Sequence, residues 1–219
     1  MSQLPFQDRA EAGRLLAARL VRRESPESTI VLGLPRGGVP VAFQISHLLD
    51  APLDVAVVRK VGVPWQPELA MGAVGMGGFE ALDRKLIAEL GISSEEVRKA
   101  AEREREEVRR REKLYRDGLP PPDLRAKTVI LADDGLATGA SMAVAAGWVR
   151  SFRPARIVVA APVGSAEACW RLKQQADEVV CLATPEPFHA VGEWYVDFRQ
   201  VSEEEVRELL ARRRSETVR

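Results

Sequence analysis

One stretch, residues 127–142 (KTVILADDGLATGASM), joins a strand pattern, two carboxylates and a loop of small residues. Its β-branched apolar run, residues 128–132, indicates a buried strand, and residues 142–149 have the pattern of a helix. Asp133 and Asp134 lie directly after the strand. Carboxylates accept hydrogen bonds from neighbouring hydroxyls, and N–H groups at a helix N-terminus hold an oxyanion such as phosphate. A sugar phosphate requires both kinds of group.

Apolar runs rich in β-branched residues recur along the chain and are separated by segments with helical periodicity. Such runs are typical of strands that are buried on both faces, as in parallel sheets. This alternation predicts an α/β fold with a mostly parallel five-stranded sheet and helices on both faces. The expected strands cover residues 28–34, 53–58, 128–132, 156–161 and 178–182, and the expected helices cover residues 8–20, 41–49, 141–152, 165–175 and 203–213.

Residues 61–125 differ in composition from the rest of the chain, and we expect them to be an insertion in a single domain, residues 1–219. Segments 69–74 and 79–82 are predicted to pair as a β-hairpin. Ser93 and Glu96 form a capping box for a long polar helix, in which acids and bases alternate at three- and four-residue spacings. We therefore expect a solvent-exposed helix and no separate core in this insertion.

The formal charge is balanced, with 32 Lys and Arg residues against 32 Asp and Glu residues, so charge gives no argument for nucleic acid or membrane surfaces as partners. No apolar run approaches the ~20 residues that a membrane span needs. The two cysteines, Cys169 and Cys181, lack metal-site spacing. These features favour a reducing, cytoplasmic compartment and argue against structural zinc.

A second turn, Pro35-Arg36-Gly37-Gly38, follows the first predicted strand and leads into a helix. Its N–H groups and arginine suit pyrophosphate, although a plain tight turn is the simpler interpretation of these residues taken alone. Arg59 and Lys60 follow the strand predicted at residues 53–58, at the edge of a parallel sheet where ligands bind. A pair of solvated charges is an equally good interpretation of these two residues.

The acidic pair at residues 133 and 134 allows three interpretations: a magnesium cluster, a phosphoacceptor site or a clamp for ribose hydroxyls. The loop that follows, with its Thr-Gly-x-Ser order, favours the sugar-phosphate interpretation. This loop lacks the Gly-Lys-Ser/Thr ending of a Walker motif and the G-x-G-x-x-G spacing of dinucleotide folds. An ATPase and a dehydrogenase are therefore disfavoured.

The order of apolar strand, Asp-Asp, short spacer and Thr-Gly-x-Ser resembles the ribose-phosphate signature of the type I phosphoribosyltransferases. The resemblance covers residues 29–182 and implies binding of phosphoribosyl pyrophosphate (PRPP), with Mg²⁺ held mainly by the substrate and by water and not by protein ligands. It assigns Asp133 and Asp134, the catalytic candidates, to the ribose hydroxyls. It assigns the 5-phosphate to Ala137, Thr138, Gly139, Ala140 and Ser141, and the pyrophosphate to Arg36, Gly37, Gly38, Arg59 and Lys60.

The implied reaction is transfer of phosphoribose to an unidentified, nucleobase-like small molecule with release of pyrophosphate. Residues 184–201 take the place of the family's hood, where Phe188, Val191 and Trp194 either line a planar ring or simply pack the hood on the core. The hypoxanthine-guanine branch carries an acid in the phosphate loop where this chain has Ala137, which disfavours a 6-oxopurine acceptor. The alternative is a non-catalytic regulator that binds PRPP or a nucleotide. A homo-oligomer is compatible with the sequence, which gives no oligomeric state.

Overall fold

A computed structural model of the chain describes residues 4–21 and 28–217. The chain forms two compact units, which are described separately. The core unit comprises Met1–Ala56 and Pro122–Arg219, and the insertion unit comprises Val57–Pro121. The insertion unit corresponds within four residues to the predicted insertion at residues 61–125. That the chain forms one domain stays a prediction.

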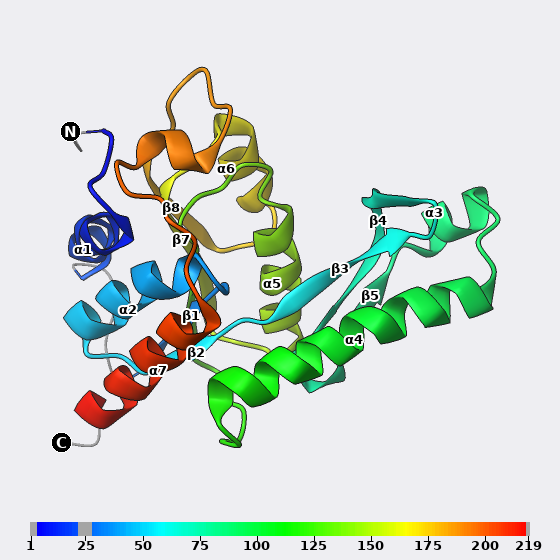
Figure 1. The fold of residues 1–219 in the computed structure, drawn as a ribbon, viewed down its shortest axis with the longest axis horizontal. Coiled ribbons are helices and arrows are strands. Elements are labelled where there is room, and N and C mark those ends of the chain that lie inside the picture. Colours follow the sequence, from blue (N-terminus) through cyan, green and yellow to red (C-terminus); the bar gives the residue numbers. More distant parts are fainter. Residues whose placement is uncertain (1–3, 22–27, 218–219) are drawn as a thin grey trace. The chain divides into compact units, whose positions relative to one another are not determined.

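The core unit is built on a parallel sheet with the strand order β2-β1-β6-β7-β8 (Figure 1). Every residue of β1 is buried, as expected for a strand covered on both faces. The predicted α/β fold with a parallel five-stranded sheet is therefore confirmed. The strands are β1 (Thr29–Gly33), β2 (Leu53–Val55), β6 (Thr128–Ala132), β7 (Arg156–Val163) and β8 (Glu178–Ala183).

Helices cover both faces of this sheet, as predicted (Figure 1). One face packs against α1 (Arg9–Leu20) and α2 (Gly38–Leu49), with α7 (Glu203–Thr217) against α2. The other face packs against α5 (Ala140–Ser151) and α6 (Ala166–Leu172). Residues 184–201 contain only one short helical turn, η3 (Val191–Trp194), and are otherwise irregular.

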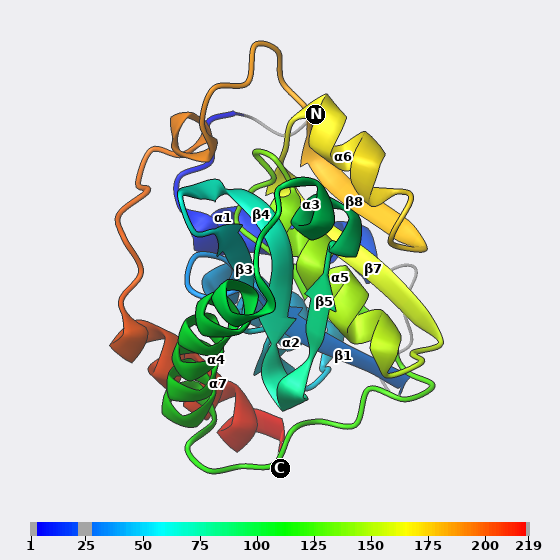
Figure 2. The same ribbon diagram turned by 90° about the vertical axis from the view of Figure 1, so that its right-hand side faces the viewer.

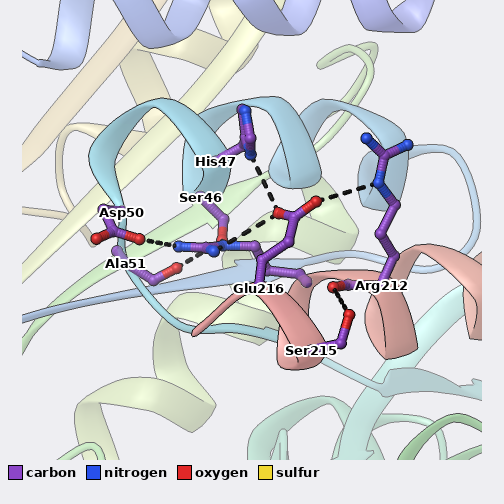
Figure 3. Close-up of polar contacts among 8 residues, drawn as sticks. Ser46, His47, Asp50, Ala51, Arg212, Ser215 and Glu216 are labelled. Atoms are coloured by element: carbon purple, nitrogen blue, oxygen red, sulfur yellow. Dashed lines mark hydrogen bonds and ion pairs between the residues drawn. The ribbon is translucent and has the colours of Figure 1, made fainter. Parts of the chain in front are cut away.

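A polar cluster joins the C-terminal ends of α2 and α7 (Figure 3). Arg213, whose side chain is 3% exposed, donates to Ser46 Oγ over 2.9 Å and to Asp50 Oδ1 over 2.7 Å. Glu216 contacts His47 Nδ1 at 3.1 Å. Because these bonds satisfy a buried guanidinium, they fix the last helix to the core unit.

The insertion unit contains a three-stranded antiparallel sheet in the order β3-β4-β5, with the long helix α4 packed along β3 and β4 (Figure 2). The predicted hairpin is confirmed as the β4–β5 pair, and Ser93 and Glu96 form the predicted capping box. The elements are β3 (Val58–Val63), β4 (Gln66–Gly75), η2 (Met76–Gly78), β5 (Glu80–Leu82), α3 (Arg84–Glu89) and α4 (Ser94–Arg116).

Two sequence predictions are wrong in detail. The apolar run at residues 53–58 predicts one strand of the parallel sheet, but β2 ends at Val55 and β3 begins at Val58 in another sheet. A continuous apolar run does not show where a chain leaves a sheet, because Ala56 and Val57, between the two strands, are as buried as a strand residue. In the first predicted helix, the spacing of Ala12, Leu15, Leu16 and Leu20 predicts that all four lie on the packed face, but Leu15 is 41% exposed, whereas Arg9 is buried.

In the described residues, 4–21 and 28–217, no helix has the length and apolar character needed to cross a membrane.

Candidate functional site

The site lies where β1 and β6, neighbouring parallel strands, end side by side. Gly33 and Ala132 are partners in the register, so the turn at residues 35–38 and the acidic pair emerge at the same edge of the sheet. Leu34 N–H donates to the carbonyl of Ala132 over 2.9 Å, which holds the start of the turn against the end of β6. Parallel topology therefore joins two motifs that lie about a hundred residues apart in the sequence.

The two glycines of the turn lie directly against the acids. A Cβ atom on Gly37 would lie 2.0 Å from Asp134 Oδ2. A Cβ on Gly38 would lie 2.5 Å from the carbonyl oxygen of Ala132 and 3.0 Å from Asp133 Oδ1. Any side chain at either position would displace the carboxylates or the backbone, which gives a physical reason for the Gly-Gly pair.

Arg36 is half-buried in the same turn. Its guanidinium has no hydrogen bond or ion pair to the part of the chain that the structure describes. Val39 N–H donates to the carbonyl of Arg36 over 3.2 Å, so the first turn of α2 begins immediately after this residue. The turn thus presents a cation at the N-terminus of a helix, an arrangement suited to an anion.

The two carboxylates differ in their surroundings. Asp133 Oδ1 accepts a hydrogen bond from Asp134 N–H over 2.9 Å. Burial raises the pKa of Asp133 well above its ordinary value, and the adjacent charge of Asp134 raises this pKa further. Asp134 instead forms an ion pair between its Oδ2 and Arg9 Nε over 2.7 Å.

Arg9 and Tyr195 complete the surroundings of the acidic pair, and neither was predicted to lie in the site. The Tyr195 hydroxyl donates to the carbonyl of Asp134 over 2.6 Å. Burial and the charge of Asp134 raise the pKa of Tyr195, which favours the protonated, donating form. A signal for Arg9 was present in the sequence, because Arg9 lies on the same helical face as Ala12 and Leu16, and a charge on an apolar face needs a partner.

The loop at residues 135–141 is anchored by backbone bonds and leads into α5. Leu136 N–H donates to the carbonyl of Val163 over 2.9 Å, and Ser165 Oγ donates to the carbonyl of Ala137 over 2.8 Å. Gly139 has a φ of 70° at the N-cap of α5. Ala137, Thr138 and Ser141 are exposed, whereas Gly139 and Ala140 are partly exposed. The first N–H groups of a helix lack intrahelical acceptors, so this loop has donors for an oxyanion.

The hood side chains pack on the core unit. Phe188, Val191 and Trp194 are partly buried and pack against a cluster of Phe6, Ala12, Val163 and Tyr195. Phe188 and Trp194 stack with ring centroids 6.3 Å apart. A Cβ on Gly135 would lie 2.4 Å from Val191, so this side chain also covers the start of the loop at residues 135–141. The packing interpretation thus has structural support, and contact with an acceptor ring stays a prediction.

Arg59 and Lys60 belong to the insertion unit, in β3, and not to an end of the parallel sheet. Arg59 Nη2 lies 2.8 Å from Glu104 Oε2, while Lys60 is exposed. The ion pair within the insertion unit gives Arg59 a structural partner. Participation of either residue in pyrophosphate binding stays a prediction.

Comparisons with known proteins place the chain in one family. A family model described as the phosphoribosyl transferase domain matches residues 6–199. A Mycobacterium tuberculosis (strain ATCC 25618 / H37Rv) protein named "Putative phosphoribosyl transferase Rv0571c" is 43% identical over 207 residues, which are 94% of this chain and 46% of the relative. This chain therefore spans about half the length of the curated relatives that it matches.

Solved structures show the same fold. TT1426 from Thermus thermophilus superposes with a TM-score of 0.86 at 44% identity, over 95% of this chain and 99% of that chain. The AQ2163 protein from Aquifex aeolicus has a TM-score of 0.52 at 12% identity, over 84% of this chain and 78% of that chain, which is a likeness of fold alone. From the converging motifs and the family match, this chain belongs to the phosphoribosyl transferase domain family.

Proposed function

We propose that this protein binds PRPP and transfers its phosphoribosyl group to a ring nitrogen of a nucleobase-like acceptor, with release of pyrophosphate. The observation that carries the proposal is the contact between the turn at residues 35–38 and the acidic pair, where a Cβ on Gly37 would lie 2.0 Å from Asp134. The carboxylates, which can accept hydrogen bonds from a diol, thus lie at the same edge of the sheet as the N–H groups of the turn, which can bind an anion. The loop at residues 135–141 begins at this edge too. Family membership supports the same donor substrate.

Each part of the site would have a separate task. Asp133 and Asp134 would accept hydrogen bonds from the ribose hydroxyls, and the N–H groups of residues 137–141 would hold the 5-phosphate. Arg36 would contact the pyrophosphate, which leaves with the electron pair of the C1–O bond as the acceptor nitrogen forms its bond to C1. Because the loop carries Ala137 and no acid, catalysis would depend on positioning and electrostatic stabilisation, and the acceptor's proton would pass to solvent or to the departing pyrophosphate.

Magnesium would accompany the substrate. The acidic pair offers two carboxylates, of which Asp134 is already paired with Arg9. In the residues that the structure describes, no cluster of three or more His, Cys, Asp or Glu side chains is suited to a metal ion. Since Mg²⁺ prefers six oxygen ligands and retains water, this donor set fits an ion held by pyrophosphate oxygens and water. Such an ion would neutralise charge on the leaving group.

A non-catalytic regulator that binds PRPP or a nucleotide is the second candidate function. It is favoured by exposed Ala137, which leaves the phosphate loop without a carboxylate to act as a base. Calorimetric titration with PRPP and Mg²⁺, followed by a pyrophosphate-release assay over adenine, hypoxanthine, guanine, uracil and orotate, separates the two candidates. Release with one base supports the transferase, binding without release supports the regulator, and failure of the folded protein to bind PRPP contradicts both.

A further inference from the structure

Arg9, the first residue of α1, extends its side chain to the end of β6. Its Nε lies 2.7 Å from Asp134 Oδ2, and the two side chains are 10% and 14% exposed. Removal of a guanidinium from water is unfavourable unless its hydrogen bonds are replaced. The ion pair with Asp134 therefore helps to hold the Arg9 side chain in place.

The same guanidinium also binds the end of the hood segment. Arg9 Nη1 donates to the carbonyl of Arg199 over 2.8 Å, and its Cζ lies 3.9 Å from the centre of the Phe198 ring. The ring faces a cation that has been removed from solvent, which is the favourable setting for a cation–π contact. Arg9 thus connects one carboxylate of the site to two consecutive residues of the hood.

Charged and hydrogen-bonding groups from several parts of the chain surround Asp133. Asp134 follows it in the chain, Tyr195 approaches from the hood, and the turn at residues 35–38 brings Arg36 to the same strand edge. The charge of Asp134 raises the pKa of Asp133, whereas the positive charge of Arg9 lowers this pKa. A hydroxyl group donates best to an ionised carboxylate, so the charge of Arg9 bears directly on ribose binding.

We propose that Arg9 is a positioning residue for ribose recognition, which orients Asp134, supplies the counter-charge for the acidic pair and fastens the hood segment to it. This role rests on the proposed function. Two nitrogens of Arg9 are already bonded within the chain, Nε to Asp134 and Nη1 to the carbonyl of Arg199. In the proposed role, Arg9 acts on the substrate through the carboxylates that it holds.

The test compares three variants by calorimetric titration with PRPP and Mg²⁺ across a pH series. Arg9→Gln removes the charge, Arg9→Lys retains the charge without the planar fork, and Arg14→Gln is a matched control at an exposed position of the same helix. We expect Arg9→Gln to bind PRPP at least about tenfold more weakly at neutral pH, with partial recovery in Arg9→Lys. The control should bind as the wild type does.

The pH dependence distinguishes positioning from a loss of fold. Affinity should fall as pH drops through the pKa of Asp133, because a protonated carboxyl group is a weaker acceptor than a carboxylate. Without the charge of Arg9 this pKa is higher, so the fall in affinity should begin roughly one pH unit higher in Arg9→Gln than in the wild type. In Tyr195→Phe, which loses only the hydroxyl bonded to the Asp134 carbonyl, affinity should weaken without this shift.

Two results would overturn the role. If the wild type binds PRPP while Arg9→Gln, shown by circular dichroism to be folded, binds within twofold of it and with the same pH profile, the role fails and the proposed function stands. If the wild type itself does not bind PRPP, the proposed function and this role both fail. Should Arg9→Gln not fold, Arg9→Lys decides alone: weaker PRPP binding than in the wild type, with the wild-type pH profile, supports the role because the charge is kept and the planar fork is lost. Wild-type affinity in Arg9→Lys contradicts it.

Discussion

A methyl group at residue 37 would occupy the space that the carboxylate of Asp134 now fills, at 2.0 Å from Oδ2. We therefore expect Gly37→Ala to abolish measurable PRPP binding while the core unit stays folded, because either the turn or the acid must move. Gly147→Ala is the matched control, since a Cβ at this exposed position in α5 meets no atom within 4 Å. It should bind PRPP normally and gain roughly 0.5 to 1 kcal/mol of stability. Titration calorimetry and urea unfolding measure both effects, and wild-type affinity in Gly37→Ala would contradict the assigned geometry.

Asp134→Asn retains the shape of the side chain and removes its charge. We expect PRPP binding to weaken about tenfold, because a charged acceptor forms stronger hydrogen bonds than an amide oxygen. Since the charge of Asp134 raises the pKa of Asp133, the residual affinity should persist to lower pH than in the wild type. This shift is opposite in sign to the one expected for Arg9→Gln. Calorimetry over a pH series checks it, and shifts of the same sign in both variants would exclude the charge coupling.

At the level of single residues, the sequence shows the acids and glycines but not their neighbours. Asp133, Asp134, Gly37 and Gly38 stand out because turn chemistry and strand ends are local patterns. The partner of Arg9 lies 125 residues away, and no local pattern gives a contact at that separation. The charge on the apolar face of the first helix signals only that a partner is needed.

At the level of elements, the buried Arg213 ties α7 to α2. Arg213→Met fills a similar volume but removes the bonds to Ser46 and Asp50, so we expect unfolding free energy to fall by about 2 kcal/mol. Arg207→Gln, which removes a surface pair with Glu204 in the same helix, should change it by less than about 0.5 kcal/mol. Urea unfolding measures both variants. Equal effects would show that the buried cluster adds nothing beyond a surface ion pair.

Apart from β2, the strands of the core unit were predictable because each is an apolar run closed by a turn or a charge. For example, β6 occupies the predicted residues 128–132. The separation of β2 from β3 was not predictable, since Ala56 and Val57 continue the apolar run where the chain passes from one unit to the other. The role of the hood could not be predicted from its aromatic residues, because Phe188 and Trp194 suit packing on the core and binding of a planar ring equally well.

At the level of the whole molecule, the two units depend on charge in different ways. Several carboxylates of α4 are held ionised by their neighbours. A hydrogen bond from Arg110, together with Arg111, lowers the pKa of Glu107 to about 2, against an ordinary value of 4.5. Hydrogen bonds from Ser93 lower the pKa of Glu96, and hydrogen bonds from two arginines lower that of Glu102. These groups stabilise the insertion unit above their ordinary pKa, and the stabilisation is lost as pH falls toward the lowered values.

The core unit responds to acid with a compensation that α4 lacks. Glu216 and Asp177 also have lowered pKa values, so their protonation destabilises the core unit in the same way. Asp133 has the opposite sign: its pKa is raised in the folded state, so acidification through that pKa favours folding until the ordinary value is reached.

Between about pH 5 and about pH 2, we therefore expect the insertion unit to open before the core unit. Hydrogen-exchange mass spectrometry, corrected for the pH dependence of intrinsic exchange, should show protection lost first in peptides of α4 and last in those of β6 and β7. In about 1 M NaCl, where the screening length is ~3 Å, the pairs of α4 contribute less and the difference should shrink. Earlier opening of β6 and β7 would show that these surface carboxylates do not set the order of acid unfolding.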